Sequence, residues 1–149
     1  MSKTKNVLVL NGPNLNMLGM REPDIYGYQT LDEIEVKCRK IAEGRGVAQE
    51  WFQSNSESPL IDKIQQNIDK VDWVVINAAG LTHTSVVLRD ALAMFPGNII
   101  EVHLSNIHAR ESFRHKSLIS PIAIGIIAGF GAFSYQMALE FITNFSSET

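Results

Sequence analysis

The sequence predicts an α/β fold with a parallel sheet at its centre, and three observations support this prediction. Five short apolar segments alternate with helical segments along most of the chain. The apolar segments carry few polar residues, as do strands that are covered by helices on both faces. Right-handed crossovers between five such strands favour one strand order. We therefore expect a flavodoxin-like three-layer sandwich with a five-stranded parallel sheet of order 2-1-3-4-5.

The first half of the chain predicts two strands and one capped helix. Residues 7–10 form an apolar run of strand length. Thr30 and Glu33 have the spacing of a capping box, in which each side chain accepts a hydrogen bond from the other residue's backbone N–H. We therefore expect a helix from residue 31 to about Gly44 or Gly46. Residues 47–53 are half polar, which in a parallel sheet indicates an edge strand.

The second half predicts three more strands and three more helices. Ser58 and Pro59 indicate a helix start, because proline in the first turn loses no helical hydrogen bond. Thr84 or a neighbour is expected to cap the helix that ends near Phe95. The remaining expected elements are strands at 72–77, 98–104 and 122–127, a polar loop at 105–117, and a last helix at 132–145.

Length and composition limit the classes of protein to which the chain can belong. With 149 residues, we expect a single domain covering residues 1–149. The net charge is −3 and acids and bases are interspersed, so there is no basic stripe for nucleic acid. The N-terminal MSKTKN lacks the apolar core of a secretory signal, and no long apolar run follows. We expect a cytoplasmic protein whose partners are a small-molecule substrate and copies of itself, with no membrane partner.

Two apolar features predict burial rather than chemistry. Cys38, the only cysteine, shares a helical face with Leu31, Ile34 and Ile41, which indicates a buried structural thiol. Strand five is an edge strand in the expected order, yet the segment around it, ISPIAIGIIAGFGAF, is strongly apolar. We therefore expect another subunit to cover this edge.

Polar residues gather where such a sheet binds its ligands, beyond the carboxyl ends of the strands. They are Asn11 and Asn14 after the first strand, residues 77–83 after the third, and Glu101, His103, Ser105 and Asn106 at the end of the fourth, with Arg110 and Arg114 beyond. The loop after the first strand also carries Arg21 and Tyr26, which lie between Gly19 and Gly27. The two glycines are suitable hinge positions for a segment that closes over a substrate. The simpler alternative is a polar surface loop.

Glu101 and His103 are two residues apart on an expected strand, so their side chains point to the same face. The carboxylate can then orient the imidazole as a general acid or base. A buried ion pair without catalytic work is one alternative. A metal site that uses the four histidines is another, but no closely spaced pair has a helical or cysteine-based ligand pattern.

Other chemistries lack their motifs. No glycine-rich dinucleotide or P-loop motif follows a strand, no acidic pair follows the first strand, and no lysine lies inside an apolar strand. Two alternatives to an enzyme remain: a flavodoxin-like module that binds a flavin or nucleotide, and a catalytically silent scaffold.

Three segments closely resemble the type II 3-dehydroquinate dehydratases: LNGPNLNMLGMREPDIYG, NAAGLTHTSVVLRDAL and IEVHLSNIHARESFRHKSLISPIAIGIIAGFG. They extend from residue 10 to residue 131. The resemblance implies reversible dehydration of 3-dehydroquinate to 3-dehydroshikimate through an enolate, in aromatic biosynthesis by the shikimate pathway or in quinate breakdown. It implies no cofactor and no metal, and a dodecamer built from trimers.

The resemblance also implies roles for individual residues. The base falls on Tyr26, the lid arginine on Arg21, the enolate-stabilising asparagine on Asn14, and the general acid on His103, oriented by Glu101. Substrate-binding positions fall on Asn77, His83, Leu104, Ser105 and Arg114, and on Asp90 of a neighbouring subunit. Arg110 matches a motif arginine that supports the loop, while Arg21 and Arg114 are expected to favour the phenolate of Tyr26. Leu104 replaces a frequent isoleucine, a mild change for a backbone contact.

Overall fold

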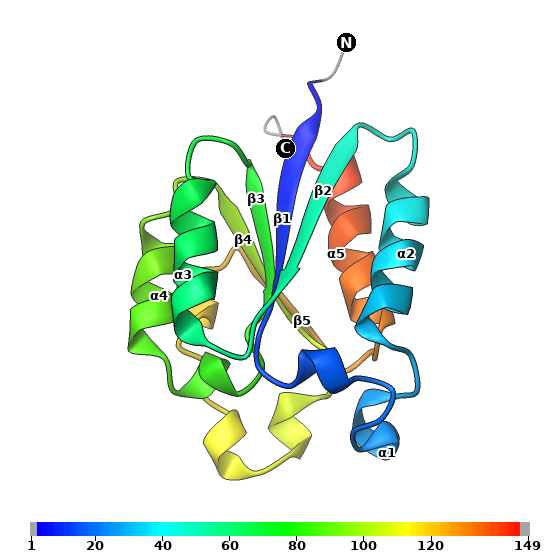
Figure 1. Ribbon diagram of the computed structural model, residues 1–149, viewed down its shortest axis with the longest axis vertical. Helices are drawn as coiled ribbons and strands as arrows, with labels where there is room; N and C mark the ends of the chain where they lie inside the picture. The colour runs from blue at the N-terminus through cyan, green and yellow to red at the C-terminus, as the bar shows by residue number, and fades with distance from the viewer. Residues whose placement is uncertain (1–2, 147–149) are drawn as a thin grey trace.

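Five parallel strands form one sheet in the order β2-β1-β3-β4-β5 (Figure 1), which confirms the predicted flavodoxin-like topology. The computed structural model describes residues 3–146. The strands are β1 (Lys5–Asn11), β2 (Val47–Gln53), β3 (Trp73–Asn77), β4 (Asn98–His103) and β5 (Gly125–Ala128). As predicted, β2 and β5 lie at the two edges.

Helices cover both faces of the sheet. The helices are α1 (Pro23–Tyr26), α2 (Leu31–Ala42), α3 (Glu57–Gln66), α4 (Val86–Ala93) and α5 (Phe133–Asn144). Helices α2 and α5 pack together on one face, and α3 and α4 on the other (Figure 1). Short 3-10 turns, η1 (Leu15–Met17), η2 (Ala79–His83), η3 (Ile107–Ala109), η4 (Ser112–Arg114) and η5 (Ser120–Ile122), lie in the connections. Among residues 3–146, no helix is both long enough and apolar enough to cross a membrane.

The alternation of side chains along β1 explains why the sheet has two hydrophobic cores. Val7 and Val9 pack into the core under α2 and α5, whereas Leu8 and Leu10 pack into the core under α3 and α4. Successive strand residues point to opposite faces, so a continuous apolar run serves both layers. Burying each aliphatic side chain of this kind contributes about 1.5–3 kcal/mol to the free energy of folding.

The helix starts follow the predicted caps. Thr30 and Glu33 form the predicted capping box at the start of α2. Ser85, the neighbour of Thr84, caps α4, because its hydroxyl accepts a hydrogen bond from the backbone N–H of Leu88 at 3.1 Å. Helix α3 begins at Glu57, which leaves Pro59 within the first turn as expected.

Two predicted boundaries were wrong. Helix α2 ends at Ala42 rather than near residue 44 or 46, and both Gly44 and Gly46 have positive φ angles, 72° and 74°, which an α-helix does not allow. Strand β5 begins at Gly125 rather than at Ile122, because η5, with Pro121 in its first turn, occupies that part of the segment. Proline cannot donate a hydrogen bond to a neighbouring strand, which favours the turn.

Candidate active site

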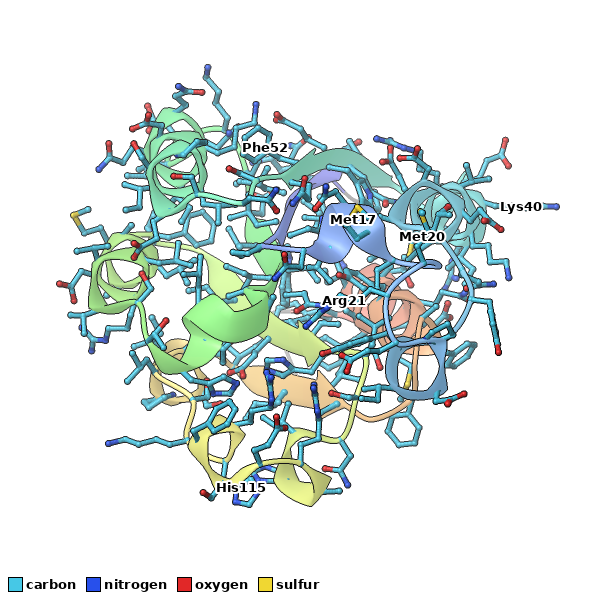
Figure 2. The ribbon with its side chains drawn as sticks, turned by 60° about the horizontal axis from the view of Figure 1, so that its bottom comes forward. Met17, Met20, Arg21, Lys40, Phe52 and His115 are labelled. Carbon is cyan, nitrogen blue, oxygen red and sulfur yellow. The ribbon has the colours of Figure 1, made fainter. Side chains whose placement is uncertain are left out.

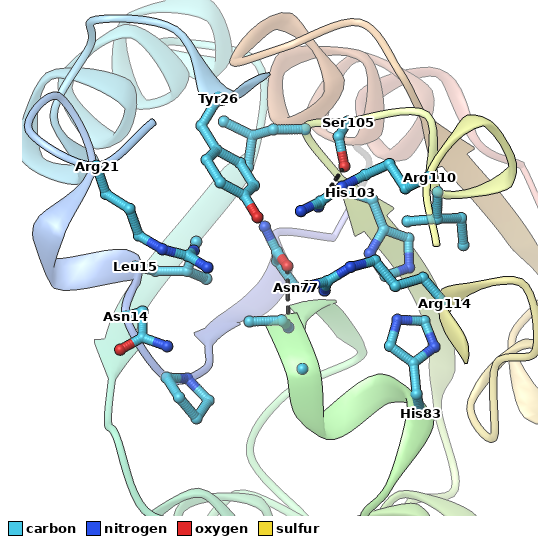
Figure 3. A pocket seen from close by; sticks show the side chains of 15 residues that line it. Asn14, Leu15, Arg21, Tyr26, Asn77, His83, His103, Ser105, Arg110 and Arg114 are labelled. Carbon is cyan, nitrogen blue, oxygen red and sulfur yellow. Dashed lines mark hydrogen bonds between the residues drawn. The ribbon is translucent and has the colours of Figure 1, made fainter. Parts of the chain in front are cut away.

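A cavity of about 160 Å³ opens beyond the carboxyl ends of β1, β3 and β4. It is lined by nine of the predicted site residues, namely Asn14, Arg21, Tyr26, Asn77, His83, His103, Leu104, Ser105 and Arg114 (Figure 3). The backbones after β1 and β3 meet closely at its floor, where the Gly12 N–H donates to the Asn77 carbonyl at 2.8 Å. A Cβ on Gly12 would lie 2.4 Å from the carbonyl oxygen of Ala78, so only glycine fits.

The loop after β1 carries Arg21 and Tyr26 to the cavity. Tyr26 is the last residue of the short helix α1, which Pro23 opens. Glu22, at the N-cap of this helix, has a φ of 38°, and Gly19 and Gly27 have φ angles of 91° and 85°. In a view onto this end of the molecule, Arg21 points from the loop toward the middle, beside the exposed Met20 (Figure 2). The loop therefore turns at three backbone positions that ordinary side chains rarely adopt.

Two guanidinium groups lie over the Tyr26 ring. The Cζ atom of Arg21 is 4.7 Å and that of Arg110 5.2 Å from the ring centroid. Arg110 also donates from Nη1 to the Ser105 hydroxyl at 3.2 Å.

The expectation that Arg114 also favours the phenolate remains a prediction, because the cation found over the ring beside Arg21 is Arg110. Arg114 lines the cavity, but its Nε atom donates to Glu111 at 2.9 Å and its guanidinium lies over Phe113. Arg110 takes the position beside Tyr26. Both arginines follow β4 in a loop without periodicity, so the sequence offered no signal to choose between them.

The predicted Glu101–His103 contact forms at the end of β4. His103 Nε2 and Glu101 Oε2 are 2.5 Å apart, the carboxylate is fully buried, and the imidazole reaches the cavity. Glu101 Oε1 also accepts hydrogen bonds from Ser117 at 3.0 Å and Ser120 at 2.6 Å, two partners that sequence reasoning missed. Burial alone would raise the pKa of the Glu101 carboxyl, but these three hydrogen bonds and the neighbouring imidazole hold it below its ordinary value. The carboxylate is therefore available to hold the ring and to stabilise an imidazolium.

His83 and Asn77 form the side of the cavity near η2. The His83 ring is nearly parallel to that of His103, with centroids 6.5 Å apart, and its Nδ1 is 2.8 Å from the carbonyl oxygen of Lys116. Asn77 Oδ1 accepts a hydrogen bond from the Ala79 N–H at 3.1 Å, drawn as a dashed line in Figure 3. Both side chains are thus oriented by backbone groups before any ligand binds.

Asp90 is a predicted site residue that, like Glu101, does not line the cavity of its own chain, and unlike Glu101 it makes no hydrogen bond or ion pair, among residues 3–146, to a residue that does. It lies on α4 with its side chain 59% exposed, and its Oδ1 is 3.1 Å from Nη1 of Arg89. The expectation that Asp90 acts in the site of a neighbouring subunit remains a prediction.

Other titratable groups do not form a second centre in the part of the chain that the structure describes. Residues 3–146 contain no group of three or more His, Cys, Asp or Glu side chains arranged to hold a metal ion. Cys38 is buried in the core under α2, where desolvation raises the pKa of its thiol to about 12. Such a thiol is protonated and a poor nucleophile.

The cavity combines groups for removing one proton and delivering another. On one side, a phenol lies under two guanidiniums. On another, a carboxylate-held imidazole faces the same space. Amide, hydroxyl and guanidinium groups between them suit a small anionic, hydroxylated ligand.

Comparison with known proteins identifies the family. The sequence model of the family described as dehydroquinase class II matches residues 5–143. A protein named 3-dehydroquinate dehydratase 2 from Pseudomonas aeruginosa is 56% identical over 137 residues, which cover 92% of this chain and 93% of the relative. The 3-dehydroquinate dehydratase of Glaesserella parasuis is 52% identical over 95% of this chain and 96% of its own. The crystal structure of type II dehydroquinase from Propionibacterium acnes superimposes with a TM-score of 0.91 at 41% identity, covering 97% of this chain and all of that one. The chain belongs to the class II dehydroquinase family of hydro-lyases.

Proposed function

We propose that this chain converts 3-dehydroquinate to 3-dehydroshikimate in the shikimate pathway through an enolate, with Tyr26 as the base and His103 as the general acid. One observation carries the proposal: a single cavity holds both the arginine-flanked phenol and the imidazole that Glu101 holds. The dehydratase names of the relatives support the same reaction.

The first step is removal of the proton next to the substrate ketone. A tyrosine in water is almost entirely protonated at neutral pH, so it needs nearby positive charge to act as a base. Arg21 and Arg110 supply that charge at 4.7 and 5.2 Å from the ring centroid. The proton passes to the Tyr26 oxygen, and the negative charge moves to the carbonyl oxygen. Asn14, at the cavity wall, donates a hydrogen bond to that enolate oxygen directly or through water.

The second step is loss of the β-hydroxyl group. The enolate electrons re-form the ketone and the new carbon–carbon double bond, and the hydroxyl leaves as water once His103 gives it a proton. Because Nε2 faces Glu101, Nδ1 is the ring nitrogen left for the ligand. Glu101 stabilises the charged imidazole before the proton is delivered.

The remaining cavity residues bind the substrate. Arg114 suits the substrate carboxylate, whereas Asn77, His83 and Ser105 suit its hydroxyl groups. Leu104 contributes a backbone contact. In an assembled oligomer, Asp90 of a neighbouring subunit is the last of the substrate-binding residues.

The direct test mixes the protein with 3-dehydroquinate and follows the ultraviolet absorbance of the conjugated product. Product formation is expected with no added cofactor. Chelators, and borohydride added with substrate, should leave turnover intact because the proposed steps need neither a metal nor an imine. A protein that forms no product, or that loses turnover with either reagent while still folded, contradicts the proposal.

Base and acid are separated by following exchange of the abstracted proton with deuterated solvent. In His103→Ala the enolate still forms but rarely expels hydroxide, so exchange should continue while product formation is lost. Loss of both activities to the same degree in a folded variant would remove His103 from the acid role.

We propose that the chain assembles into a dodecamer of trimers, as the family resemblance implies, and the exposed edge of the sheet supports a contact between subunits. Ile124 and Ile126 on the β5 edge, together with Phe130 and Phe133, are each at least half exposed. A contiguous apolar edge of this kind is typical of a subunit interface. Light scattering on active fractions should give the mass of a large homo-oligomer. A monomeric mass would also remove the proposed role of Asp90.

A further inference from the structure

Tyr135, which does not line the cavity, connects two asparagines that end neighbouring strands. It lies on α5 and is fully buried. Its hydroxyl donates to Asn11 Oδ1 at 2.6 Å and accepts from Asn77 Nδ2 at 3.0 Å. Asn11 and Asn77 are register partners at the carboxyl ends of β1 and β3, and of the two only Asn77 lines the cavity.

Backbone groups at both ends fix the direction of this hydrogen-bond chain. At one end, Asn11 Nδ2 donates to the Phe52 carbonyl at 3.2 Å. At the other end, Asn77 Oδ1 accepts from the Ala79 N–H at 3.1 Å. A carbonyl cannot donate and an N–H cannot accept, so neither amide can be reversed without opposing two like groups. The hydroxyl must therefore donate toward Asn11 and accept from Asn77.

We infer that Tyr135 is a positioning residue that orients the Asn77 amide, so that the second Nδ2 hydrogen is presented to a hydroxyl group of the substrate. The inference rests on the proposed function and names a residue that acts through Asn77 without touching the ligand. One Nδ2 hydrogen goes to Tyr135, and the hydrogen bonds among residues 3–146 give the other no protein partner.

The surroundings of Tyr135 hold its ring and its hydroxyl group in place. Its ring packs against Trp51, with centroids 5.5 Å apart. Burial raises the pKa of the phenol well above its ordinary value, so the hydroxyl keeps the proton that it donates to Asn11. Ala79, at the end of the chain, has a φ of 52°, and the bond from its N–H to Asn77 helps to hold this unusual conformation beside the ligand.

The test is a double-mutant cycle on Tyr135→Phe and Asn77→Ala, measured as kcat and KM for 3-dehydroquinate. Tyr135→Phe keeps the ring and removes only the hydroxyl. We expect it to raise KM roughly tenfold, the scale of one hydrogen bond, with kcat changed less than about twofold. In the Asn77→Ala background the same substitution should change KM less than about twofold, because the group it orients is gone.

Ile142→Val is the matched control. Ile142 is also fully buried on α5, but it takes no part in the chain of hydrogen bonds. The substitution weakens packing of the same helix, and KM should stay at the wild-type value. A rise in KM with Ile142→Val equal to that with Tyr135→Phe would mean that general loosening of α5 is responsible, and would overturn the inference.

The outcomes separate this inference from the proposed function. Wild-type protein without dehydratase activity would refute the proposed function. Active wild-type protein in which the effects of Tyr135→Phe and Asn77→Ala on KM multiply independently would refute only the positioning role. If Tyr135→Phe does not fold, Asn11→Ala replaces it, because loss of the acceptor frees the hydroxyl to turn toward Asn77. The same rise in KM, absent in the Asn77→Ala background, would then support the inference, and an unchanged KM would overturn it.

Discussion

The two sides of the cavity are built in different ways. His103 is 4% exposed and lies at the end of an interior strand, where it contacts Glu101. The Glu101 carboxylate in turn accepts hydrogen bonds from two serines. Arg21 on the opposite loop has a side chain that is 32% exposed, and its ion pair with Glu22 is 3.9 Å long. The proposed acid is thus held by the folded sheet, whereas Arg21, one of the two cations beside the proposed base, depends on the loop.

This difference in how the side chains are held matches the two proposed roles, general acid and base. A group that is held before substrate arrives needs no reorganisation when charge develops, which suits the imidazole and its carboxylate. We expect the loop that carries Arg21, which has positive φ angles at Gly19, Glu22 and Gly27, to close over a bound substrate and exclude water. We therefore expect substitutions on the loop to act mainly on turnover, and those under His103 to act on both turnover and folding.

Tyr26→Phe should have the largest effect. The ring still packs under Arg21 and Arg110, and only the ionisable oxygen is lost. We expect turnover to fall by about 10²–10⁴, the usual contribution of a general base, with substrate binding measured by calorimetry largely retained. A variant that keeps more than roughly a tenth of wild-type turnover, or that still exchanges the substrate proton at the normal rate, would remove Tyr26 from the base role.

Arg21→Ala should come next, with a loss of roughly 10² in kcat, because one of two charges beside the phenolate disappears. Arg21→Lys is the matched control, since it keeps the positive charge but removes the planar guanidinium. It should recover part of the lost turnover. If alanine and lysine variants are equally impaired at equal stability, the guanidinium serves a shape-dependent contact and not the phenolate.

Glu101→Gln should have a smaller effect on turnover, about 10–100-fold, as loss of an orienting partner does. Its distinct signature is the pH dependence of stability. A carboxyl whose pKa is lower in the folded protein stabilises the fold above its unfolded pKa and loses that contribution as the pH falls through the folded pKa. Because the pKa of Glu101 lies below the ordinary 4.5, wild-type protein should lose free energy of unfolding as the pH drops below about 4.5.

Urea unfolding from pH 7 to pH 3 checks this prediction. The difference in unfolding free energy between wild type and Glu101→Gln should shrink as the solution becomes acidic. Glu111→Gln is the control for burial. The pKa of the Glu111 carboxyl is also lowered, but this carboxyl is exposed, whereas that of Glu101 is buried. A constant difference for Glu101→Gln over this range would argue against a buried, ionised carboxylate.

Local and periodic signals in the sequence predicted the fold well. The apolar run of β1 feeds two cores because its side chains alternate, and Thr30 and Glu33 mark the start of α2 with their own hydrogen bonds. These features need only neighbours in the chain. The predicted start of β5 was wrong because an apolar stretch does not distinguish a strand from the turn that Pro121 favours.

The site was harder to predict where partners are far apart in the chain. The contact of Glu101 with His103 follows from strand geometry, but its bonds to Ser117 and Ser120 depend on how the next loop folds back. The Asn77–Tyr135 bond joins residues 58 positions apart. No local pattern encodes such pairs, so a single sequence cannot reveal them.

Thr30→Ala should have the smallest effect, and it tests where the loop ends and the rigid part begins. The Thr30 hydroxyl accepts from the Glu33 N–H at 3.2 Å, and a Cβ on Gly19 would lie 3.3 Å from the Thr30 methyl group, so the loop packs against this cap. Loss of an N-cap costs about 1 kcal/mol, or about 2–4 °C in Tm for a chain of this size. We expect that loss with kcat and KM within about twofold of wild type, since the hydroxyl bonds only inside α2 and to no cavity group. Ser85→Ala, which removes the cap of α4, provides the comparison for stability. If Thr30→Ala instead lowers turnover by more than its stability loss explains, the cap also anchors the loop, and the boundary between the two sides of the cavity lies inside α2.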